Sequence, residues 1–153
     1  MYQVIIAGIC GITIFIQDIK TREIHLIPVL LLIGSGLSFH WSNTGITALL
    51  SFFINLIFLA AILLGVIFIY RIRGEKQIMD RMLGWGDVLA LVAVAAWMEP
   101  PDFLFFYTLS TLFIGLTFSV LKWLGRLDSN YPIPLAGWLC LFFNIYLSIY
   151  CFL

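Results

Sequence analysis

Two aspartates beside apolar stretches are the residues of this chain whose chemistry needs explaining first. Asp18 follows the apolar run 4–16, and Asp87 opens the run 87–98 directly after Gly84-Trp85-Gly86. An ionisable group in or beside a membrane span is costly, so it marks a functional site by default. Two carboxyls held close together share a proton, so that one acts as general base on water and the other as general acid. The pair therefore suits hydrolysis of an amide by aspartyl chemistry, which needs no metal and no cofactor.

The two glycines before Asp87 have a physical use in such a site. Gly84 and Gly86 can let the backbone enter a helix without Cβ clashes, and they leave room for an extended substrate. Gly-x-Gly-Asp is a weak pattern alone, and its value comes from its place at the start of a short apolar helix. The alternative is that Asp18 and Asp87 are solvated residues that cap helix ends. For either aspartate alone the two interpretations are about even, whereas the pair favours function.

The composition indicates that lipid surrounds most of the chain. Of its 153 residues 63% are hydrophobic and 10% are charged, whereas soluble domains are about one-quarter charged. We predict an all-α integral membrane protein with about six transmembrane helices, forming one domain over residues 1–153. The expected helices follow six apolar stretches: 4–16, 24–39, 45–70, 87–98, 103–124 and 132–153.

Basic residues predict the orientation. All eight lie on the joints after the first, third and fifth stretches: Lys20, Arg22, Arg71, Arg73, Lys76, Arg81, Lys122 and Arg126. The positive-inside rule then places these joints in the cytoplasm and both termini outside. Both aspartates fall on the cytoplasmic face of the inner membrane, where lipid is a partner. The net charge of zero argues against nucleic acid as a partner.

Helix rise places the two aspartates at similar depth. Asp87 lies 12 residues before Glu99, about 18 Å along a helix, and Asp18 lies 16 residues after Tyr2, about 24 Å. Both positions are somewhat below the inner surface of a hydrocarbon core about 30 Å thick. We therefore expect the two side chains to meet if the first and fourth helices pack together.

These motifs resemble the type IV prepilin peptidase family, a group of Gly-x-Gly-Asp membrane aspartyl proteases. Three segments carry the resemblance: Gln17 to Ile24, Gly84 to Asp87, and Ile133-Pro134-Leu135-Ala136-Gly137. The resemblance implies that Asp18 and Asp87 are the catalytic pair, with Gly84 and Gly86 as motif support. It also implies prepilin or pseudopilin substrates of type IV pilus and secretion systems. Such a precursor has a basic leader followed by an apolar helix.

Two positions depart from the family pattern. His25 follows Ile24 where the family usually has proline, and Leu89 stands where relatives often have lysine. Both departures put substrate contacts in doubt rather than the chemistry. The cysteine-containing segment of the larger relatives, which also methylate their product, has no counterpart here. The chain therefore looks like a minimal, peptidase-only member.

Other functions remain open on the sequence. A protease that cuts inside the substrate's own membrane span shares the Gly-x-Gly-Asp logic. A proton- or ion-coupled transporter could use the two aspartates as a relay, although the interiors of the third and fifth stretches contain no acidic or basic residue. A catalytically inactive scaffold for pilus assembly is the third alternative.

Several other residues have simpler interpretations. His25 and His40 are expected at opposite membrane interfaces, and Trp97 as an interfacial anchor. Asn55, deep in the third stretch, is expected to form hydrogen bonds across the bundle. Asp80 is the next candidate if Asp87 proves not to be catalytic.

Overall fold

The protein is described here by a computed structural model that covers residues 2–21, 23–72, 84–125 and 134–152. These ranges contain six helices and no strand, which confirms the all-α class. The helices are α1 (Tyr2–Lys20), α2 (Leu26–Thr44), α3 (Thr47–Ile72), α5 (Trp85–Ala95), α6 (Pro100–Trp123) and α7 (Leu135–Phe152).

Four of the helices are long and apolar enough to cross a membrane. They cover Tyr2–Lys20, Leu26–Thr44, Thr47–Ile69 and Pro100–Trp123, whereas α5 and the described part of α7 are shorter apolar helices. Large apolar side chains face outward on these helices: Ile9 is 62% exposed, Leu64 65% and Phe105 67%. A surface this apolar is unfavourable in water and favourable in lipid.

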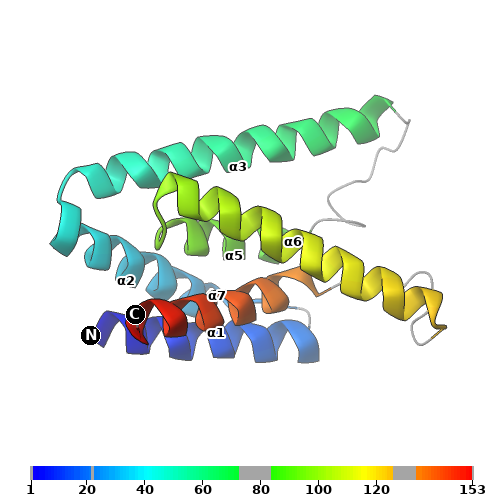
Figure 1. Ribbon diagram of the computed structural model, residues 1–153, viewed down its shortest axis with the longest axis horizontal. Helices are drawn as coiled ribbons and strands as arrows, with labels where there is room; N and C mark the ends of the chain where they lie inside the picture. The colour runs from blue at the N-terminus through cyan, green and yellow to red at the C-terminus, as the bar shows by residue number, and fades with distance from the viewer. Residues whose placement is uncertain (1, 22, 73–83, 126–133, 153) are drawn as a thin grey trace.

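The helices form a bundle in which α1, α2 and α7 lie together and α3 lies along the far side of α5 and α6 (Figure 1). α1 packs chiefly against α2 and α7, and α5 also packs chiefly against α2 and α7. From the sequence, direct packing of the first helix on the fourth was the condition for the two aspartates to meet, whereas in the structure both helices pack chiefly on α2 and α7. α5 is central in the bundle, and α7 and α2 connect it to α1.

The basic residues that the structure describes lie at one end of the bundle. Lys20, Arg71 and Lys122 lie in the last turns of α1, α3 and α6. α5 and α7 begin at that same end, and both chain termini lie at the opposite end (Figure 1). The other five basic residues lie outside the described part of the chain: Arg22, Arg73, Lys76, Arg81 and Arg126. Whether the basic end faces the cytoplasm stays a prediction.

Two helix boundaries differ from the apolar stretches in ways that affect the aspartates. α1 extends to Lys20, so Asp18 lies inside its last turn rather than after it. α5 begins at Trp85 and ends at Ala95, which makes it about 16 Å long and too short to cross a hydrocarbon core of about 30 Å. Apolar runs miss such ends, because polar residues can occupy the terminal turns of a helix.

The chain between α5 and α6 turns inside the bundle. Ala96, Trp97 and Met98 are nearly fully buried, and non-helical backbone at this depth needs partners within the protein. Asn55 of α3 supplies two of them, because its Nδ2 donates to the carbonyls of Ala95 at 3.0 Å and Met98 at 2.8 Å. His40 Nε2 of α2 donates to the Trp97 carbonyl at 2.8 Å. The expected hydrogen bonds of Asn55 across the bundle are confirmed.

Trp97 is not the interfacial anchor that we expected. Its side chain is only 4% exposed, its indole stacks on Phe39 with ring centroids 5.3 Å apart, and its Nε1 donates to the Leu32 carbonyl at 2.8 Å. The sequence suggested an interface because Trp97 comes just before Glu99 and two prolines. The turn after α5 instead carries the indole back into the bundle.

Replacing Asn55 with leucine should destabilise the protein by about 2 kcal/mol, because two buried carbonyls lose their donors. Denaturant unfolding in detergent micelles, followed by tryptophan fluorescence, would measure this loss. Thr13→Val is the matched control, since within the described ranges the Thr13 hydroxyl donates to the Ile9 carbonyl of its own helix and to no other helix. Equal stability of the two variants would contradict the role of Asn55.

Candidate active site

α1 carries Asp18 on its inward face. The side chain of Asp18 is only 7% exposed. It continues a buried stripe that recurs every three or four residues, as expected for one face of a helix. The stripe consists of Ala7, Cys10, Gly11, Ile14 and Asp18. The helix that buries this stripe therefore also fixes where the carboxyl lies.

α5 holds Asp87 in its first turn. Gly84 is the N-cap residue of α5, and Asp87 Oδ2 accepts a hydrogen bond from the Gly84 N–H at 3.1 Å. An acidic residue at the third helical position commonly reaches back in this way to the N-cap amide. The bond satisfies a donor that the helix itself leaves without a partner and restricts the orientation of the Asp87 side chain.

The two glycines before Asp87 differ in how closely other atoms approach them. Gly84 has a φ of −70°, which any residue can adopt, and a Cβ on it would come no closer than 3.5 Å to Asp87 Oδ2. A Cβ on Gly86 would lie 2.8 Å from Cδ1 of Ile24. Gly86 thus lets the joint between α1 and α2 pack against the start of α5.

The first turn of α7 binds both aspartates. Gly137 N–H donates to Asp18 Oδ2 at 2.6 Å, and Ala136 N–H donates to Asp87 Oδ1 at 2.8 Å. Consecutive amide nitrogens of a helix are about 2.8 Å apart, so the two bonded oxygens lie within about 8 Å of each other. Asp18 also acts electrostatically on Asp87. We refer to Asp18 and Asp87 as the carboxyl pair.

Helix geometry explains why the carboxyl pair is tolerated here. The first N–H groups of a helix have no partner within it and carry partial positive charge. The N-terminal turns of α5 and α7 both supply such groups, through Gly84, Ala136 and Gly137. These donors offset part of the cost of removing two carboxyls from water.

Comparison of the sequence with known protein families gave a match that includes both aspartates. A family model described as the type IV leader peptidase family matches residues 5–120. The chain belongs to the type IV leader peptidase family. It is therefore a leader-peptidase-type protease and, given its apolar helices, a multi-pass membrane protein. A search of curated proteins and a search of solved structures each gave no match.

The matched region of the family contains both aspartates and ends before α7. The donors Ala136 and Gly137 therefore lie outside it. Sequence reasoning noted the segment Ile133 to Gly137 but assigned no role to it. The available signal was the pair of small residues Ala136 and Gly137, two positions after Pro134 at the start of an apolar helix, a pattern that permits close approach of another side chain.

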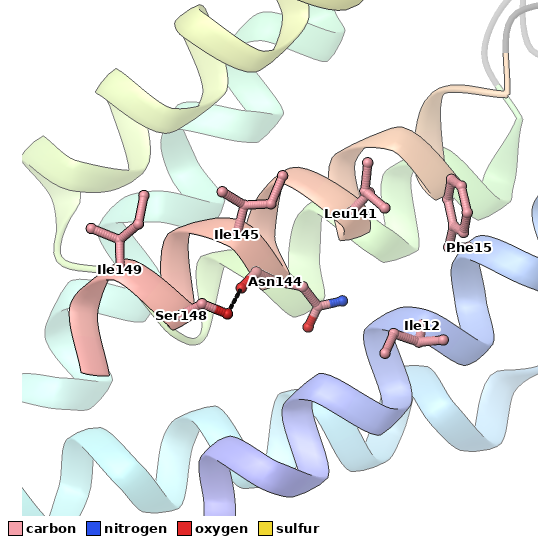
Figure 2. Close-up of a pocket in the computed structure, with 7 residues that line it drawn as sticks. All are labelled: Ile12, Phe15, Leu141, Asn144, Ile145, Ser148 and Ile149. Carbon is pink, nitrogen blue, oxygen red and sulfur yellow. Dashed lines mark hydrogen bonds between the residues drawn. The ribbon is translucent and has the colours of Figure 1, made fainter. Parts of the chain in front are cut away.

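α1 and α7 approach closely along their length. The side-chain amide of Asn144 packs against Gly11 of α1, with its Nδ2 buried and without a hydrogen-bond partner in the described ranges. Figure 2 shows the apolar groove between the two helices. Its lining residues are Ile12, Phe15, Leu141, Asn144, Ile145, Ser148 and Ile149. The carboxyl pair is not part of this groove.

The joint between α1 and α2 is also held to the site. Gln17 Oε1 accepts a hydrogen bond from the backbone N–H of His25 at 3.2 Å. This bond holds the joint in place, so that Ile24 packs against Gly86.

The sequence also singled out His25, Leu89 and Asp80. His25 is exposed, and Leu89 is partly buried against the core. Asp80 lies outside the described residues. Among the residues that the structure describes, no three His, Cys, Asp or Glu side chains gather as metal ligands.

Proposed function

We propose that the chain is a membrane aspartyl endopeptidase that removes the leader peptide of prepilin or pseudopilin-like precursors. The observation that carries the proposal is the carboxyl pair, bound by consecutive amides of α7. Membership of the type IV leader peptidase family supports the class of reaction. Asp18 and Asp87 are the proposed catalytic residues.

The proposed reaction is a direct attack of water on the scissile carbonyl. One carboxylate accepts a proton from the water molecule, whose oxygen bonds to the carbonyl carbon. The protonated carboxyl of the other aspartate donates a hydrogen bond, then its proton, toward the carbonyl oxygen. The C–N bond of the tetrahedral intermediate breaks as the departing nitrogen takes up the proton that the first aspartate accepted from water, and a hydroxyl of the intermediate returns a proton to the second aspartate as the carbonyl re-forms. The products are a leader with a free carboxylate and a shortened protein with a new amino terminus.

The proposed site of cleavage is the cytoplasmic face of the inner membrane. Support comes from Lys20, Arg71 and Lys122, which lie at the end of the bundle where α5 and α7 begin (Figure 1). Basic residues favour the cytoplasmic side. A precursor with its apolar helix in the bilayer would present the residues before that helix at the depth of the carboxyl pair.

Cleavage in liposomes tests this function. The purified chain would be reconstituted with a precursor that has a basic leader and an apolar helix, and the released leader would be identified by mass. We expect the parent protein to remove the leader and the double variant Asp18→Asn/Asp87→Asn to leave the precursor intact. A folded parent that cleaves none of several such precursors would refute the proposal, and proton flux in the same liposomes would then test the transporter alternative.

A further inference from the structure

We propose that the first turn of α7 sets the geometry of the carboxyl pair, with Gly137 as the positioning residue for Asp18 and the Ala136 amide as the positioning group for Asp87. This inference rests on the proposed function, because it assigns a role in the reaction to a segment outside the matched family region. It concerns residues that lie 119 and 49 positions away from the aspartates in the chain.

The first step of the argument is that α7 connects the two aspartates. α1 and α5 each pack on α7 more extensively than on each other. The separation of Asp18 and Asp87 therefore depends on a third helix. Because Ala136 and Gly137 are consecutive residues of that helix, the spacing of their amides is fixed by the peptide backbone.

The second step concerns space at Gly137. A Cβ built there would lie 3.0 Å from Asp18 Oδ2, 3.2 Å from Asp18 Cβ and 3.4 Å from Cδ2 of Phe15. A Cβ at this position would require Asp18 to shift by a few tenths of an ångström relative to the amide that binds it. Ala136 differs, because its methyl group is accommodated and fully buried. The lack of a side chain matters only at the position that donates to Asp18.

The third step is that other glycines supply matched controls. Gly115 and Gly34 have nothing within 4 Å of a built Cβ, so alanine there adds no contact. At Gly36, a Cβ would lie 2.5 Å from Cδ1 of Trp97, so alanine there disturbs packing away from the carboxyl pair. These variants separate a loss of positioning from a loss of folded protein.

The first experiment compares the kinetics of Gly137→Ala, Gly115→Ala and Gly36→Ala on the precursor in liposomes. We expect Gly137→Ala to lower kcat about tenfold with KM unchanged, because small displacements of reacting groups are costly. Its pH–rate profile should also change shape, whereas Gly36→Ala should scale the rate by its folded fraction at every pH. An unchanged kcat for Gly137→Ala, or a loss that only follows its folded fraction, would overturn the proposal.

A second experiment removes the donors without adding atoms. Lactic acid in place of Ala136, or glycolic acid in place of Gly137, replaces one N–H with an ester oxygen and keeps the side chain. Either ester should lower kcat about tenfold, whereas an ester in place of Leu135, which is not one of the two donors, should not. Equal activity of all three esters would refute the role of the amides, even if Gly137→Ala fails to fold.

A measurement independent of cleavage distinguishes failure of this inference from failure of the proposed function. In the 15N-labelled protein, Asp18→Ala should shift the amide resonance of Gly137 more than that of Leu135. Asp87→Ala should likewise shift the resonance of Ala136. If these shifts occur but the parent never cleaves, the contacts are real and the proposed function is wrong. If they are absent, the inference is wrong whatever the activity.

Discussion

Asp18→Asn and Asp87→Asn should each reduce the rate of leader removal about a thousandfold, because an amide can neither accept nor release the proton that the reaction transfers. The fold should persist in both variants. An asparagine oxygen can still accept the Gly137 or Ala136 N–H that the carboxylate accepts in the parent. Initial rates measured by mass in liposomes, at equal amounts of inserted protein, would give the ratio.

The matched control for these variants is Asp102→Asn. Asp102 is an exposed aspartate in the first turn of α6, at the opposite end of the bundle from the carboxyl pair (Figure 1). Its replacement should leave the rate within about twofold of the parent. If either Asp18→Asn or Asp87→Asn cleaves at the parental rate, that aspartate is structural, and Asp80 becomes the next residue to test.

Gly36→Ala should cost about 3 kcal/mol of unfolding free energy, the largest stability effect that we expect from adding one methyl group. A Cβ at Gly36 would lie 2.5 Å from Trp97 Cδ1, 2.7 Å from Trp97 Nε1 and 2.8 Å from the Ala96 carbonyl oxygen. The indole cannot move aside easily, because it stacks on Phe39 and donates to the Leu32 carbonyl. Denaturant unfolding in micelles would measure the loss.

Gly34→Ala is the control on the same helix. A Cβ at Gly34 meets nothing within 4 Å, so this variant should be as stable as the parent or slightly more stable, because alanine favours a helix over glycine. Similar stabilities of Gly34→Ala and Gly36→Ala would contradict the close approach of α2 to Trp97. The same result would contradict the proposal that the contacts of Trp97 with α2 hold the turn after α5 in place.

Local properties of the chain were accessible from sequence. Its 63% hydrophobic content and six apolar stretches predicted a helical membrane protein, since hydropathy acts within each segment. Asp18 and Asp87 were found because an acidic residue beside an apolar helix is unusual wherever that helix packs. The motif around Asp87 indicated the family for the same reason, because its residues are neighbours in the chain.

Tertiary structure decided how the aspartates are brought together. The bond from Gly137 to Asp18 joins residues 119 positions apart, and no periodicity within α1 or α7 specifies it. The same holds for Trp97 and Asn55, whose hydrogen-bond partners lie in other parts of the bundle. Hydropathy describes transfer of a side chain into lipid, whereas these contacts depend on which helices pack side by side. The backbone amides of α7 illustrate the difference, because every residue but proline has such a donor and only the fold selects two of them to bind the carboxyl pair.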